Sequence, residues 1–244
     1  MKKNLLLTLT LLSCLLIQAS AQTTGDYQSN AASFNWNAAA SWQRWNGTAW
    51  VSNPTEGYPG QNASGIAGLV TIRNGHTVTA NVDVTTNDLG ALTLSGSGRI
   101  DFSSNTDIDV TGALIMNGTS QITGSSTSRT LDVGSITIPN TATNARITNI
   151  QLRVLINDAL VATRNGSVTI NGFLNMSSTT STVSGATTVN VGATLQLTSD
   201  TGVKTFTGRV TVAGTWTPTA ITTNNNLVFG GEVLTSGTFD CGCN

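Results

Sequence analysis

Short runs of alternating apolar and polar residues recur along most of the chain, and a glycine follows each run closely. The spacing between runs is roughly 20 residues, which is typical of one repeat in a solenoid. Within each run the apolar positions alternate, as they do in a strand that buries one face. The runs occupy residues 70–72, 92–94, 108–110, 131–133, 168–170, 189–191, 210–212 and 227–229.

This period separates a solenoid from other all-β architectures. An antiparallel meander would place a turn about every 8–12 residues, whereas one rung of a parallel β-helix needs about 20. The sequence therefore predicts an all-β fold, a right-handed parallel β-helix of about nine rungs over residues 66–239, followed by a tail at 240–244. The predicted core consists of Ile72, Leu92, Leu94, Ile108, Val110, Val168, Ile170, Val189, Val191, Val210 and Val212.

The composition excludes several classes of protein. Only 9% of the residues are charged, and the formal net charge is −1 with a single histidine, so the chain lacks the basic surface that binds nucleic acid. A hydrophobic content of 39% with so little charge does not fit a disordered chain. Abundant Thr, Ser and Asn suit the outer surface of stacked strands, whose backbone groups are paired with one another.

Residues 1–21 have the features of a secretory signal peptide. Lys2 and Lys3 precede an apolar stretch at 5–17, which is too short to span a bilayer, and Ala19-Ser20-Ala21 forms a cleavage site. We expect cleavage after Ala21, a secreted or cell-surface protein, and no membrane span in the mature chain. An alternative is a lipoprotein signal in which Cys14 carries the lipid.

Residues 22–65 hold four of the five tryptophans, and we expect this segment to cap the first rung. Trp42, Trp45 and Trp50 are the candidate ligand-binding residues, because exposed indoles stack on sugar rings. The alternative is that the indoles form the core of the cap itself. We expect Trp36 and Trp42 to pack as core and Trp45 to be the more exposed contact.

The N-terminal segment and the first predicted strand together resemble a known type of module. Residues 25–30 and 34–37, the tryptophan cluster, Tyr58-Pro59-Gly60 and residues 70–78 form one continuous pattern. It resembles the N-terminal module of secreted, repeat-rich surface proteins from Bacteroidetes, and more loosely the G8 type of module. The resemblance implies an extracellular parallel β-helix and carries over no catalytic residues. Such proteins commonly end in a sorting domain, for which the 240–244 tail is too short.

Few residues are candidates for chemistry. Asp101, Asp107 and Asp109 lie close in sequence and are weak metal-ligand or general-base candidates, with outward-facing solvated carboxylates as the alternative. His76 lies in an Asn-Gly turn with no recognisable nucleophile motif, and we expect a surface turn residue. Cys241 and Cys243 are a candidate local disulfide and too few for a zinc site. No cofactor-binding motif is present.

We therefore expect a non-enzymatic, secreted or cell-surface structural or adhesive module. Its expected partners are polysaccharide or extracellular matrix. Two alternatives stay open: a carbohydrate-active enzyme of the β-helix type, or the binding part of one, and an ice-binding solenoid. The ice-binding alternative rests on the Thr-x-Thr pairs at 77–79, 205–207 and 215–219, but such pairs must recur at one phase on successive rungs.

Overall fold

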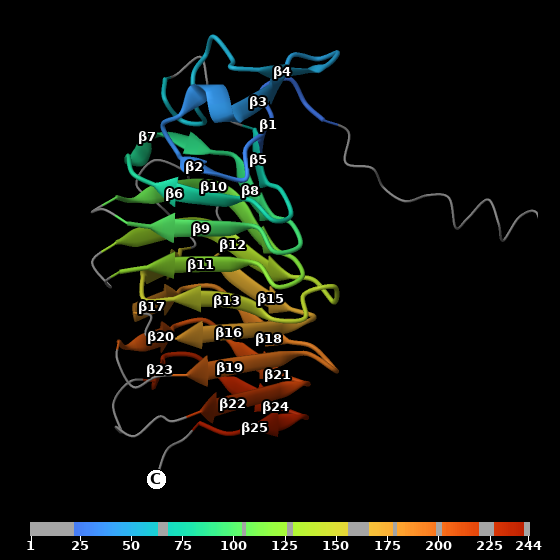
Figure 1. Ribbon diagram of the computed structural model, residues 1–244. Helices are drawn as coiled ribbons and strands as arrows, with labels where there is room; N and C mark the ends of the chain where they lie inside the picture. The colour runs from blue at the N-terminus through green and yellow to red at the C-terminus, as the bar shows by residue number, and fades with distance from the viewer. Residues whose placement is uncertain are drawn as a thin grey trace, which may run out of the picture.

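The computed structural model describes residues 22–62, 68–103, 106–125, 129–155, 166–177, 180–198, 202–219 and 227–241. The predicted signal peptide with Cys14, the boundary at 65–66 and Cys243 lie outside these ranges. Within them the chain coils around one axis, and parallel strands of successive turns stack into a solenoid (Figure 1). The predicted all-β parallel β-helix is thus confirmed. The one helical turn described is η1 (Ala39–Ser41), a 3-10 helix.

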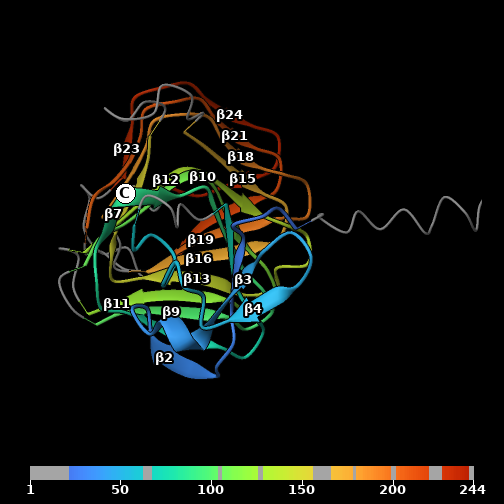
Figure 2. The ribbon, with the colours of Figure 1, turned by 90° about the horizontal axis from the view of Figure 1, so that it is seen from above.

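The strands of the solenoid form three stacks, two in the larger sheet and one in the smaller (Figures 1 and 2). Stack 1 consists of β5 (Leu69–Ile72), β8 (Ala91–Leu94), the second halves of β10 (Ile108–Met116) and β12 (Thr130–Ile138), β15 (Ser167–Ile170), β18 (Thr187–Val189), β21 (Val210–Val212) and β24 (Val233–Thr235). Stack 2 consists of β7 (Val84–Leu89), the first halves of β10 and β12, β14 (Gln151–Val154), β17 (Thr180–Val183), β20 (Lys204–Phe206) and β23 (Leu227–Phe229). Stack 3 is the smaller sheet, with β2 (Ser33–Asn35), β6 (Thr77–Ala80), β9 (Arg99–Phe102), β11 (Gln121–Gly124), β13 (Ala145–Thr148), β16 (Phe173–Ser177), β19 (Thr194–Thr198), β22 (Thr215–Thr219) and β25 (Thr238–Phe239).

The number of rungs is slightly lower than predicted. Stack 3 has nine strands, but β2 precedes residue 66, so eight of them lie in the range for which nine rungs were expected. The runs at 92–94 and 108–110 are the stack 1 and stack 2 strands of one turn, and so are the runs at 210–212 and 227–229, whereas the last turn, which begins with β24, was not among the predicted runs. Two strands of one turn were therefore counted as two rungs.

The core is a column of Val, Ile and Leu between the three stacks. Within each strand the buried and partly buried residues alternate, as in β5 and β15. Ten of the eleven predicted core residues are at most 4% exposed. The prediction was wrong for Val191, which is 83% exposed. β18 ends at Val189 and the chain turns at Gly192, so the alternation does not continue into the turn.

Glycines after the stack 1 strands allow the turns to lie on top of one another. Gly96 and Gly118 both have positive φ values, +57° and +58°. A Cβ at Gly118 would lie 2.6 Å from the carbonyl oxygen of Gly96. Both the left-handed backbone and the close approach therefore require glycine at this corner.

The N-terminal segment both begins and covers the solenoid. β1 (Tyr27–Ser29) and β2 extend the two sheets by parallel pairing with β5 and β6. The outer edge of β1 pairs in antiparallel fashion with β3 (Trp42–Trp45), which forms a hairpin with β4 (Trp50–Ser52). The hairpin lies at the blue end of the stack in Figure 1. The first parallel edge is therefore paired, which removes it as a template for another chain.

Aromatic side chains fill the interior at both ends. At the N-terminal end Trp36 and Trp42 are fully buried, and Trp42 contacts the rings of Tyr27 and Phe34 edge to face. At the C-terminal end buried Trp216 contacts Phe206, Phe229 and Phe239. Phe229 and Phe239 are only partly buried, because no further described rung covers β23 and β25.

Candidate ligand-binding face

The β3–β4 hairpin separates the predicted tryptophan candidates. Because β3 is extended, Trp42 and Trp45 point to opposite sides of it. Trp42 is fully buried, and its indole N–H donates to the carbonyl of Trp36 at 2.8 Å. Its ring is therefore not available to a ligand, and its assignment as a binding residue was wrong. The packing of Trp36 and Trp42 as core follows the expectation.

Trp45 and Trp50 lie on the outer side of the hairpin. They are cross-strand partners, and their rings meet edge to face with a centroid distance of 5.5 Å and an interplanar angle of 63°. Both are partly exposed. The pair therefore exposes apolar ring surface to solvent, and the contact between the two rings holds both in a defined orientation.

Polar side chains continue this outer surface from the hairpin onto the first rung. Gln28 donates to Gln43 at 2.8 Å, and Gln43 donates to the hydroxyl of Ser52 at 3.2 Å. Gln28 is in register with Thr71 of β5, which begins stack 1. The outer side of the hairpin and the outer side of stack 1 are thus one continuous surface.

A line of threonines runs along the outer side of stack 1, and we refer to it as the threonine file. Its members are Thr71, Thr93, Thr137, Thr169, Thr188 and Thr211, with Ile115 between the second and the third. With Ile115 included, each residue of the line is a direct register partner of the next, so the side chains repeat at about 4.8 Å, the spacing of paired strands. Leu234 of β24 ends the file.

Sequence reasoning missed this file, although its signal was present. Most members are the middle residues of apolar-Thr-apolar runs such as 70–72 and 210–212. The Thr-x-Thr pairs named above lie elsewhere. The pairs at 77–79 and 215–219 are both in stack 3, but five strands without a Thr-x-Thr pair separate them, and Thr205 is in stack 2. The recurrence at one phase on neighbouring rungs is found in the middle positions of the apolar runs instead.

A second line of residues runs beside the threonine file, two residues earlier in each strand. It begins at Leu69 and continues with the small residues Ala91, Ala113, Ser135 and Ser167. These short side chains leave a low shelf next to the threonines. From Thr71 to Thr188 neither line contains an ionisable side chain over the described strands, and Arg209 lies beside Thr211.

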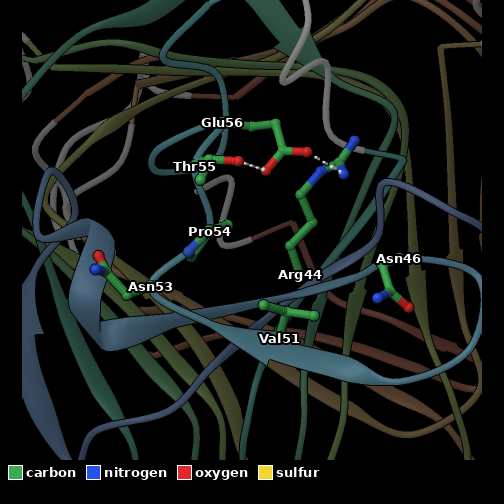
Figure 3. Close-up of a pocket in the computed structure, with 7 residues that line it drawn as sticks. All are labelled: Arg44, Asn46, Val51, Asn53, Pro54, Thr55 and Glu56. Atoms are coloured by element: carbon green, nitrogen blue, oxygen red, sulfur yellow. Dashed lines mark hydrogen bonds and ion pairs between the residues drawn. The ribbon is translucent and has the colours of Figure 1, made fainter.

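A pocket of about 230 Å³ lies on the opposite side of the hairpin, lined by Arg44, Asn46, Val51, Asn53, Pro54, Thr55 and Glu56 (Figure 3). Arg44 and Glu56 point toward each other and form an ion pair at 2.8 Å. The guanidinium also lies 5.9 Å from the centroid of the Tyr27 ring. Since Arg44 is already neutralised by Glu56, an anionic ligand would have to compete with that carboxylate.

Burial controls the ionisation of Tyr27 beneath this pocket. Desolvation raises the pKa of Tyr27 to about 12, and the nearby charge of Arg44 opposes this shift only in part. The phenol is therefore neutral at physiological pH and belongs to the aromatic cluster rather than to the acid–base chemistry of the pocket.

The three aspartates singled out from the sequence do not come together. Asp101 lies on stack 3, where it accepts a hydrogen bond from Thr123 and pairs with Arg99 at 2.5 Å. Asp109 lies on stack 2, opposite Asp132. Asp107 precedes β10 and accepts the backbone N–H of Thr130 at 2.7 Å. The described residues contain no group of three His, Cys, Asp or Glu side chains that could hold a metal ion.

His76 has a partner that the sequence did not reveal. Its Nδ1 lies 2.8 Å from the hydroxyl oxygen of Ser29, which is 47 residues away in the chain. The Ser29 hydroxyl also accepts the backbone N–H of Arg73 at 2.9 Å, and the tautomer of His76 determines which of the two side chains donates in the Ser29–His76 bond. Ser29 is fully buried, so this Ser–His pair joins the first two rungs and offers no accessible nucleophile.

The chain is thus a parallel β-solenoid with a line of threonines on the outer side of stack 1 and an aromatic pair at one end. No family model, no curated protein and no solved structure matches it. Among the described residues, no helix is long and apolar enough to cross a membrane. Cys241 is partly buried, and the predicted disulfide is not tested because Cys243 lies outside the described residues.

Proposed function

We propose that the protein is a secreted or cell-surface β-solenoid that binds neutral glycans without modifying them. The observation that carries the proposal is the Trp45–Trp50 pair, partly exposed and fixed edge to face on the outer side of the hairpin. Indoles of this kind contact the apolar faces of sugar rings. The neighbouring amides of Gln28 and Gln43 supply donors and acceptors for sugar hydroxyls.

The location of the protein outside the cell rests on the sequence. The N-terminal 21 residues have the pattern of a secretory signal, and the following segment resembles modules of Bacteroidetes surface proteins. A solenoid is also a suitable scaffold for adhesion, since stacked rungs present an extended surface rather than a single pocket.

A glycan array with the mature chain, residues 22–244, tests the proposal directly. We expect binding to neutral polysaccharides, and we expect Trp45→Ala and Trp50→Ala each to weaken it about tenfold or more, as loss of an aromatic anchor does. Val51→Ala is the matched control, because Val51 is 42% exposed on the other side of the same hairpin.

Two outcomes would reject the proposal. The first is the absence of any glycan binding by a folded protein. The second is binding that both tryptophan variants leave unchanged. Release of shorter sugars from a bound polysaccharide would instead favour the alternative of a carbohydrate-active enzyme. The Arg99–Asp101–Thr123 cluster would then be the candidate catalytic site.

A further inference from the structure

The threonine file repeats one residue type along a line of register partners, whereas the corresponding lines on stack 3 mix charged, amide and hydroxyl side chains. On stack 3, Thr123 donates to Asp101 and Thr198 donates to Asn175 at 2.9 Å. Asn175 in turn donates to Gln196 at 2.7 Å. These side chains of stack 3 therefore satisfy one another across the rungs.

In contrast, none of the six threonine hydroxyls of the file makes a side-chain hydrogen bond with another described residue. Each of the six residues is partly exposed. Their hydroxyls are therefore hydrated in the free protein, and a ligand that offers hydroxyls of its own can replace that water at little cost. The side chains are β-branched and held in a strand, so little rotamer entropy is lost on binding.

The file has the dimensions of a polymer site rather than of a small-molecule site. From Gln28 to Thr211 there are seven register steps, which at about 4.8 Å each span roughly 34 Å. The shelf of Ala and Ser beside the file is flat enough for a ring to lie against the threonine methyl groups. The strip has no ionisable side chain from Thr71 to Thr188, and beside Thr211 the charge of Arg209 is balanced by Glu232 at 3.2 Å.

We infer that the threonine file binds a neutral, ribbon-like β-1,4-linked polysaccharide, whose chain runs along the solenoid axis from the Trp45–Trp50 pair. This inference rests on the proposed glycan-binding function and names its ligand class. An extended ribbon presents both apolar ring faces and hydroxyls, and each threonine of the file carries both a methyl and a hydroxyl group. Each contact is weak in water, so the affinity comes from the number of rungs that a chain covers.

Chain length is therefore the first measurement. We use β-1,4-linked oligomers of glucose, mannose and N-acetylglucosamine, from the disaccharide to the hexasaccharide, and isothermal titration calorimetry with the mature chain. Affinity for at least one series should rise about tenfold or more from disaccharide to hexasaccharide. An affinity that stops increasing at the trisaccharide would overturn the inference, since the tryptophan pair alone would then account for binding.

Substitutions in the middle of the file give the second measurement. The double variant Thr137→Val and Thr169→Val removes two hydroxyls but keeps the β-branched shape, and Ser135→Arg places a long side chain over the shelf. We expect both to lower hexasaccharide affinity at least threefold and to leave disaccharide affinity unchanged. Thr148→Val and Thr148→Arg are matched controls on the outer side of stack 3, and circular dichroism confirms that all variants fold.

The pattern of results separates this inference from the function on which it rests. If Trp45→Ala loses binding and the file variants do not, the proposed glycan-binding function is retained and the role of the threonine file is overturned. An absence of binding to every oligomer and to the parent polymers would overturn both. The protein could also partition into growing ice, and the Thr137→Val and Thr169→Val double variant could lose this property. That result would overturn the inferred polysaccharide ligand and would identify the threonine file as an ice-binding surface.

Discussion

Replacement of Trp42 by alanine tests whether the N-terminal aromatic cluster closes the solenoid. The indole is fully buried, and its ring centroid lies 5.1 Å from those of both Phe34 and Trp36. Its N–H donates to the Trp36 carbonyl at 2.8 Å. Truncation would remove the largest contact between the β3–β4 hairpin and the interior, and it would leave that buried carbonyl unpaired.

The expected loss of stability is large for a single residue. A buried Trp→Ala change costs about 3–5 kcal/mol of the free energy of unfolding. For a chain of this size, each kcal/mol lowers Tm by about 2–4 °C, so Tm should fall by roughly 6–20 °C. Trp45→Ala removes a partly exposed ring from the same strand and should cost less than about 2 kcal/mol.

Thermal and denaturant unfolding of the mature chain, followed by circular dichroism, measures both variants. Trp42→Phe serves as a graded control, because it keeps an aromatic ring but loses the hydrogen bond to Trp36. The reasoning is refuted if Trp42→Ala melts within about 2 °C of the parent protein, or if Trp45→Ala is equally destabilised.

Three further predictions concern other parts of the fold. Burial and, to a lesser extent, the charge of Arg73 lower the pKa of His76 below 6.5, so its stabilising contribution is complete above the unfolded pKa and is lost as the pH falls through the lower folded value. Tm should therefore decrease between about pH 7.5 and 5.5, and His76→Gln should reduce that decrease. Gly118→Ala should destabilise more than Gly192→Ala: both glycines have positive φ, but only at Gly118 would a Cβ approach backbone within 4 Å, and denaturant midpoints of the two variants check the order. Leu234→Lys, at a position 42% exposed on a C-terminal edge strand, should leave Tm unchanged and reduce aggregation measured by light scattering; unchanged aggregation would show that this edge is not the site of association.

The inward side of each strand could be predicted from the sequence because it depends only on local alternation. Val70 and Ile72 are buried on either side of Thr71, and the same holds around Thr211. The same alternation explains why Trp42 is buried and Trp45 is partly exposed, once the segment is known to be extended. The rule failed at Val191, where the strand had already ended.

Contacts between turns were beyond sequence reasoning, because the turns differ in length. The step from Ile138 to Ile170 in stack 1 is one turn, as is the shorter step from Ile170 to Val189. A fixed period therefore assigns residues to the wrong stack after a few rungs. The pairing of Ser29 with His76 and the separation of Asp101 from Asp109 both depend on this register.

The same limitation explains why the threonine file was not visible in the composition. Threonine is common on both stack 1 and stack 3, and composition does not distinguish the hydroxyls of one stack from those of the other. Register distinguishes them: Thr123 lies opposite Asp101 and bonds to it, whereas Thr169 lies opposite Thr137 and Thr188, and no hydrogen bond joins these three hydroxyls. The threonine file also repeats a single side chain at the spacing of paired strands, so it is the better place to look for a ligand that repeats along the axis.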